Sequence, residues 1–255
     1  MKDDRAMKRI LLFATTAIFA AAVLWLYAAD REGSGSDKTS AEKRVDRTGA
    51  EPGEWTMDIE AARRLAGELQ RPLLLNFTGS DWCGWCIQTD KKVFSQALWK
   101  SFAKNNLVLV TLDFPRRTKL PDDLSERNDA LVKKYNVEGF PTYLVLASDG
   151  KSVLGRLGTN AKITPEEFIG SLQQVLRLSP DTTTRVLKNL SPKSGERYAG
   201  ILATIKEIDK AFETWIETEP DRTPENMKKF QDFMTRIETL HKDASAIESE
   251  SGIYD

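Results

Sequence analysis

Residues 77–86 have the sequence FTGSDWCGWC, in which Cys83 and Cys86 stand three positions apart. The apolar run before them, Pro72–Phe77, is typical of a buried strand, and the small and polar residues in between indicate a turn. A helix is expected from about Cys83 to Phe94, with both cysteines facing one another on its first turn. The unpaired N–H groups and the dipole at a helix N-terminus favour a thiolate. The spacing therefore predicts a reactive thiol at Cys83 with a second thiol within reach.

Paired thiols of this kind carry out disulfide exchange. Cys83 would attack a substrate disulfide, and Cys86, one turn deeper, would attack the resulting mixed disulfide and release the product. Gly84 would let a substrate chain approach closely because it has no side chain. Trp82 and Trp85 would restrict water and offer apolar surface beside the sulfurs. The two cysteines are the predicted catalytic residues, and these three neighbours are the predicted substrate-binding residues.

The composition limits the other kinds of site. With two cysteines and one histidine, a four-ligand Cys/His zinc site cannot form without several carboxylates. A chain of 255 residues with at most one disulfide is no disulfide-stapled mini-protein. Lys and Arg number 37 against 38 Asp and Glu, which argues against a nucleic-acid partner. An inert structural disulfide and two unrelated buried thiols stay open as alternatives to a redox pair.

Strands and helices alternate around the motif. Asp58 is the expected N-cap of a helix that Arg71-Pro72 ends, and Thr164 caps the last helix, with Pro165 at its first position. The other expected elements are a short strand at 54–57, strands at 107–114, 142–147 and 152–157, a helical piece capped by Ser95 that runs to Asn105, and a helix at 124–135. This order predicts an α/β fold with helices on both faces of the sheet.

Three motifs together resemble the thioredoxin superfamily: Asn76-Phe77, the residues 82–86, and Gly139-Phe140-Pro141-Thr142. Residues 77–83, with Val93-Phe94-Ser95 behind them, are similar to exported bacterial thioredoxin-like proteins and to the thioredoxin module of thiol:disulfide interchange proteins. The resemblance covers about residues 55–177 and implies a thioredoxin-like fold. It also implies a thiol:disulfide oxidoreductase that acts on protein disulfides, needs no bound cofactor and exchanges electrons with a partner dithiol.

The resemblance adds two residues to the site. It implies that Pro141 follows a cis peptide bond and packs beside the cysteine pair. It also implies that the backbone of Phe140 binds an extended substrate, and ordinary packing against the tryptophan rings is the alternative role of Phe140.

Two positions depart from the family's pattern. Trp85 stands where thioredoxin has a proline, so the reducing strength of thioredoxin cannot be carried over to this chain. Asn76 stands where thioredoxin has a buried aspartate that helps to deprotonate the inner cysteine, and an amide accepts no proton at neutral pH. Our hypothesis is that Cys86 relies instead on water or on another carboxylate, such as Asp81 or Asp90.

The N-terminus is typical of an export signal or membrane anchor. A basic flank precedes Ile10–Ala29, a run without a charged residue that would form a helix of roughly 30 Å, enough to span a bilayer. We favour an uncleaved anchor over residues 1–29, with cleavage as the alternative. The flanking charge places the rest of the chain outside the cytoplasm, facing the periplasm. Residues 30–53 are polar and predict a flexible linker.

The C-terminal residues 179–255 predict an antiparallel α-helical hairpin, behind a thioredoxin-like domain at 54–178. Apolar residues recur at helical spacing from Tyr198 to Trp215 and from Met227 to Ile247. The stripes either bury each other and part of the preceding domain, or form a surface for substrate or for a homodimer. His241 lies on or next to the second stripe and is interpreted as a partly buried helix residue rather than a catalytic base.

As a whole, the sequence predicts a membrane-anchored thiol:disulfide oxidoreductase with reduction as the favoured direction. One alternative is a disulfide isomerase that uses the C-terminal hairpin to dimerise. Another is a non-catalytic chaperone or assembly module that keeps the fold for binding. Residues 116–119, with three cations, are interpreted as a solvated basic loop or as a contact for a partner.

Overall fold

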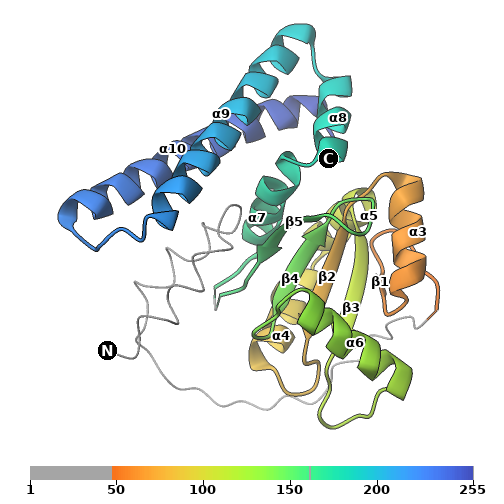
Figure 1. The fold of residues 1–255 in the computed structure, drawn as a ribbon. Helices are drawn as coiled ribbons and strands as arrows, with labels where there is room; N and C mark the ends of the chain where they lie inside the picture. Colours follow the sequence, from red (N-terminus) through yellow and green to blue (C-terminus); the bar gives the residue numbers. More distant parts are fainter. Residues whose placement is uncertain (1–47, 161, 255) are drawn as a thin grey trace. The chain divides into compact units, whose positions relative to one another are not determined.

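The computed structural model describes residues 48–160 and 162–254 (Figure 1). The predicted anchor and most of the predicted linker lie outside these residues. None of the described helices is both long enough and apolar enough to cross a membrane. The chain divides into two compact units between Gln173 and Gln174, and each unit is described by itself.

The first unit is built on a five-stranded mixed sheet with the order β1-β3-β2-β4-β5 (Figure 1). Strands β1, β3 and β2 run parallel, β4 is antiparallel to β2, and β5 is antiparallel to β4. The strands are β1 (Trp55–Thr56), β2 (Leu73–Thr78), β3 (Val108–Asp113), β4 (Thr142–Leu146) and β5 (Val153–Leu157). The predicted α/β fold is confirmed. Strand β2 ends at Thr78, and the turn that follows it leads to the cysteine motif.

The helices of this unit follow the predicted order with two differences. They are α3 (Ile59–Leu69), α4 (Gly84–Thr89), the π-helix η2 (Asp90–Phe94), α5 (Ala97–Asn106), α6 (Asp122–Lys134) and α7 (Pro165–Arg177), which continues into the second unit. The single helix expected from the motif to Phe94 changes to π-helical geometry at Asp90. Asp58 caps α3 as predicted, by accepting the Ala61 N–H, whereas α5 begins after Gln96 rather than Ser95.

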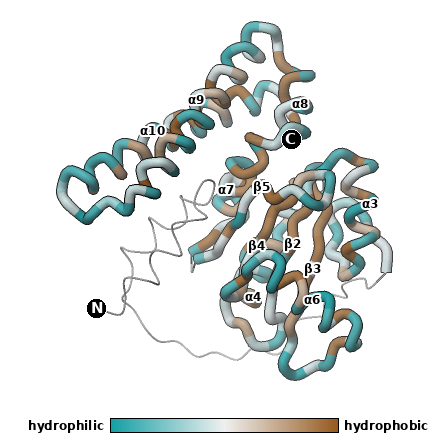
Figure 2. The backbone as a smooth tube through the Cα atoms, in the orientation of Figure 1, coloured by the Kyte–Doolittle hydropathy of each residue, from teal (hydrophilic) through white to brown (hydrophobic). Residues whose placement is uncertain are grey.

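Both faces of the sheet are buried, which explains the unbroken apolar strands (Figure 2). On one face, α3 and α6 pack against side chains of β2, β3 and β4. On the other face lies an aromatic cluster centred on Phe94, whose ring is 5.5 Å from Tyr143 and 5.3 Å from Phe168. The residue that ends η2 thus anchors the segment behind the motif to β4 and α7.

The second unit, residues 174–254, is helical. It contains the end of α7 and the helices α8 (Pro180–Asn189), α9 (Pro192–Glu217) and α10 (Pro224–Ser251). The predicted hairpin is confirmed in α9 and α10, which pack through Tyr198, Leu202, Ile205, Ala244 and Ile247. The sequence pattern did not predict helix α8. Ser179 is in fact the N-cap of α8 and accepts the Thr182 N–H.

A polar cluster is buried in the helical unit around Arg177. The guanidinium donates two hydrogen bonds to Glu248, of 2.7 and 2.6 Å, and further bonds to Ser245 and His241. Tyr198 donates to the same carboxylate at 2.6 Å. Burial, followed by the charge of Arg177, lowers the pKa of His241 to about 4, so the imidazole is neutral at pH 7. The interpretation of His241 as a partly buried helix residue fits this environment.

Candidate active site at the Cys83–Cys86 disulfide

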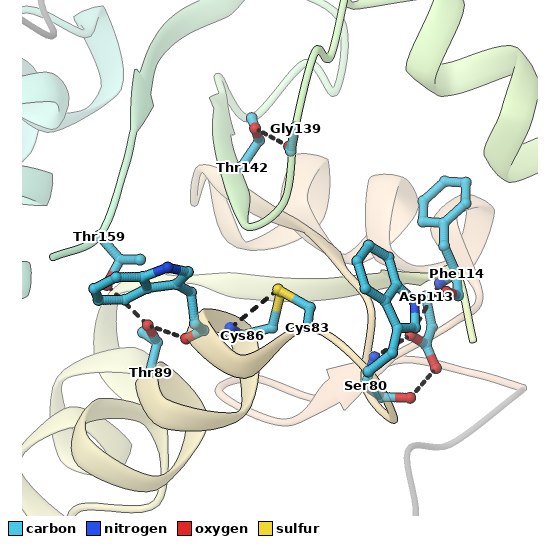
Figure 3. The surroundings of a disulfide bond; sticks show 11 residues. Ser80, Cys83, Cys86, Thr89, Asp113, Phe114, Gly139, Thr142 and Thr159 are labelled. Carbon is cyan, nitrogen blue, oxygen red and sulfur yellow. Dashed lines mark hydrogen bonds between the residues drawn. A yellow bond between two sulfur atoms is a disulfide. The ribbon is translucent and has the colours of Figure 1, made fainter. Parts of the chain in front are cut away.

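Cys83 and Cys86 form a disulfide at the start of α4 (Figure 3). Cys83 is the N-cap residue, and its Sγ accepts the Cys86 N–H at 3.2 Å. Both residues are buried, with 5% of their surface exposed. Because an amide of the first helical turn already points at this sulfur, it would also stabilise a Cys83 thiolate once the disulfide is reduced.

The surface beside the disulfide is open at Gly84 and Trp85. A Cβ atom built on Gly84 would meet nothing within 4 Å, and Trp85 is 49% exposed. The carbonyl of Trp85 is held by Thr89, whose Oγ1 donates to it at 2.9 Å and also bonds to Thr159 (Figure 3). These two predicted substrate-binding residues therefore leave room for another chain.

Trp82 is placed differently from Trp85. Its ring is half-buried, and its Nε1 donates to the Phe114 carbonyl at 2.7 Å. The Arg116 guanidinium lies over the ring at 3.7 Å from the centroid, and Phe140 meets it edge-on at 5.9 Å. A Cβ on Gly79 would come within 2.5 Å of the ring, so this turn needs a glycine to seat the tryptophan. The chain's own side chains thus hold the Trp82 ring in place.

The peptide bond between Phe140 and Pro141 is cis, as the resemblance implied. The Phe140 ring packs against Trp82 and Phe114, with the Phe114 centroid 4.9 Å away, so the expected packing against a tryptophan is present. Thr142 closes the turn by donating to the Gly139 carbonyl at 2.8 Å (Figure 3). Since Trp82 precedes Cys83 in the chain, these contacts bring the proline turn to the cysteine motif.

Two aspartates join the motif region to the end of β3 and to the residues that follow it. Asp81 accepts the backbone N–H groups of Arg116 and Arg117 at 2.9 and 2.7 Å, and that of Thr118 at 3.3 Å. Asp113 is buried and accepts the backbone N–H and the hydroxyl of Ser80 (Figure 3). Sequence reasoning did not foresee these bonds, because their partners lie more than thirty positions apart.

Asp81 and Asp90 are the carboxylates considered above as bases that could deprotonate Cys86. The amide of Arg116, more than any other partner, keeps the pKa of Asp81 below its usual value. Asp81 is thus committed to the loop and is a poor base. Asp90 is exposed on η2. The Asn76 Oδ1 is buried and has no hydrogen-bond partner among the described residues.

No metal site accompanies the disulfide in the part of the chain that the structure describes. Residues 48–160 and 162–254 hold no group of three or more His, Cys, Asp or Glu side chains placed to bind a metal ion.

The sheet order, the disulfide at a helix N-terminus and the cis-proline turn together define a thioredoxin-like domain. Comparison with family models agrees: residues 59–176 match the thioredoxin-like domain. The chain therefore carries a thioredoxin-like domain, as its sequence motifs indicated.

Two curated proteins of Chlamydia pneumoniae are similar to this domain. The disulfide bond reductase DsbH is 38% identical over 105 residues, which cover 41% of this chain and 62% of that protein. The thioredoxin-related protein DsbJ is 24% identical over 122 residues, covering 48% and 35%. The chain thus spans less than two thirds of the length of either relative. A solved structure, titled DsbH oxidoreductase, aligns with a TM-score of 0.45 and 26% identity over 57% of this chain and 96% of that one.

Proposed function

We propose that this protein is a thiol:disulfide oxidoreductase that reduces protein disulfides, with Cys83 and Cys86 as its catalytic residues. The observation that carries the proposal is the Cys83–Cys86 disulfide at the start of α4, with Cys83 in the N-cap position. The similarity to a protein named disulfide bond reductase supports reduction as the direction.

The reaction proceeds through two thiol–disulfide exchanges. The Cys83 thiolate attacks one sulfur of a substrate disulfide, forms a mixed disulfide and releases the first substrate thiolate. The Cys86 thiolate then attacks the Cys83 sulfur, which re-forms the Cys83–Cys86 disulfide and releases the second thiolate. The substrate gains two electrons, and a partner dithiol returns them to the pair.

The groups around the pair would hold the substrate chain. Gly84 and Trp85 offer an open approach and an apolar surface. The Phe140 ring contacts Trp82 of the motif, and the backbone of Phe140, before Pro141, would bind the extended substrate. Trp82 would contribute to substrate binding indirectly, by packing against Arg116 and Phe140 and so holding the site in shape.

We also propose an extracytoplasmic location, with the chain anchored in the inner membrane and facing the periplasm. The uncharged run Ile10–Ala29 behind a basic flank supports this placement. In this arrangement, residues 30–53 link the anchor to a catalytic domain at 54–178, and the helical unit follows.

A turnover assay separates the enzyme from a binding module of the same fold. The full chain, supplied with a dithiol, is expected to accelerate the reduction of a peptide disulfide. The Cys83→Ser/Cys86→Ser double variant is expected to show only the uncatalysed rate, since it has no thiol left. A double variant that keeps the protein's effect on its substrates would support the chaperone or assembly role instead.

Asn76→Asp tests how the inner cysteine is deprotonated. If Cys86 lacks a nearby base, a carboxylate at this buried position should speed the release of the mixed disulfide by about a hundredfold, the low end of the range for a positioned general base. Single-turnover kinetics would measure this step, with Asp81→Asn as the matched change at a carboxylate already used by a loop. Release that is equally fast in wild type and Asn76→Asp would contradict the idea.

A further inference from the structure

The segment that follows β3 carries a run of positively charged residues. Residues 114–121 read FPRRTKLP and contain three cations and no acid. Asp81 fixes the start of this run by accepting three consecutive backbone N–H groups, those of Arg116, Arg117 and Thr118. The backbone of this segment is therefore hydrogen-bonded to Asp81, which stands two positions before Cys83.

Arg116 is the cation that this anchoring brings to the site. Its guanidinium carbon lies 3.7 Å from the centroid of the Trp82 ring, a distance typical of a cation–π contact. A planar guanidinium stacked on a ring keeps its N–H donors available at its edge. No carboxylate lies within ion-pair distance of Arg116 among the residues that the structure describes. The group is thus fixed in position and still able to bind an anion.

The nearby acids are engaged elsewhere. Asp81 is occupied by backbone amides, and Asp113 is buried against Ser80. Lys119 is paired with Asp122 at 2.9 Å, which leaves Arg116 and the exposed Arg117 as the cations of the loop. Arg116 is therefore a cation that can meet a substrate anion on the Trp82 side of the disulfide, while Trp85 offers an exposed apolar surface.

We infer that Arg116 is a specificity-determining residue, which selects substrates that carry a carboxylate side chain close to the reacting cysteine. This inference rests on the proposed function and names the substrate class for it. A substrate carboxylate beside the attacked sulfur would accept hydrogen bonds from the edge of the guanidinium. Arginine is well suited to this contact, because its planar group can donate two parallel N–H bonds to one carboxylate.

The test uses the full chain and two disulfide-linked peptides that differ only in the residue next to the cysteine, Asp in one and Asn in the other. The wild type is expected to show a higher kcat/KM for the Asp peptide, by about threefold, which is the scale of one partly exposed ion pair. The preference should shrink at high salt. Arg116→Gln should abolish it, and Arg116→Lys should keep part of it.

Arg117→Gln is the matched control, because it removes one positive charge from the same loop without touching Trp82. It is expected to keep most of the preference. Equal kcat/KM values for the two peptides in the wild type, or a preference that survives Arg116→Gln, would overturn the inference. A small neutral disulfide tells this result apart from a failure of the proposed function: if the wild type cannot reduce even that compound, the oxidoreductase proposal itself fails.

Discussion

The Cys83→Ser variant is expected to lose catalysed disulfide reduction by at least about three orders of magnitude, the scale seen when an activated nucleophile is removed. Serine at the N-cap of α4 can still accept the Cys86 N–H, so the fold should persist. The hydroxyl, however, is no nucleophile toward a disulfide at neutral pH. The rate of peptide disulfide reduction measures the loss, and the circular dichroism spectrum confirms the fold.

Cys86→Ser provides the complementary result. This variant keeps the attacking thiolate but cannot resolve the mixed disulfide, so it is expected to accumulate a covalent adduct with substrate, visible by mass spectrometry and removed by excess dithiol. The opposite pattern, in which Cys83→Ser forms the adduct and Cys86→Ser does not, would reverse the two assigned roles. An absence of adduct in both variants would argue for an inert structural disulfide.

Arg177→Met is expected to produce the largest loss of stability, confined to the helical unit. Arg177 and Glu248 are almost completely buried, with side-chain exposures of 0% and 2%, and are joined by an ion pair of 2.6 Å. Removing one partner leaves a buried charge without compensation, which costs about 3–5 kcal/mol. Urea unfolding followed by hydrogen exchange in α9 and α10 measures this loss.

Two further variants establish the cause. Arg177→Met/Glu248→Met removes both charges and should recover most of the loss, because an apolar pair of similar size avoids the desolvation penalty. Lys119→Met breaks the exposed pair with Asp122 and should cost less than about 1 kcal/mol. In Arg177→Met, the pKa of His241 should also rise from about 4, since the charge of Arg177 contributes to lowering it. Equal losses in Arg177→Met and the double variant would contradict this account.

The parts of the fold that could be predicted are those encoded by local patterns. The apolar runs of β2 and β3, the cap at Asp58 and the cysteine spacing each follow from neighbouring residues. The cis bond before Pro141 came from the family resemblance rather than from any local signal. Ser179-Pro180 shows the limit of local reasoning, because the same residues that end one helix also cap and begin the next.

The parts that could not be predicted depend on contacts between distant residues. The loop held by Asp81 and the stacking of Arg116 on Trp82 join segments about 35 positions apart. Arg177 meets Glu248 across 71 positions. In the sequence these residues appear as ordinary surface charges, since charge pattern alone does not reveal which groups become buried or anchored. Their partners become visible only when the sheet and the helices are assembled.

The reduction potential of the Cys83–Cys86 pair tests the central claim most directly. The pair is equilibrated with glutathione buffers, and its oxidised fraction is followed by thiol alkylation. We expect reversible exchange with a potential closer to the value of about −270 mV for thioredoxin than to the value of about −120 mV for a strong periplasmic oxidant. A potential of about −180 mV or above would contradict reduction and favour an isomerase or oxidase. A pair that never exchanges would contradict catalysis altogether.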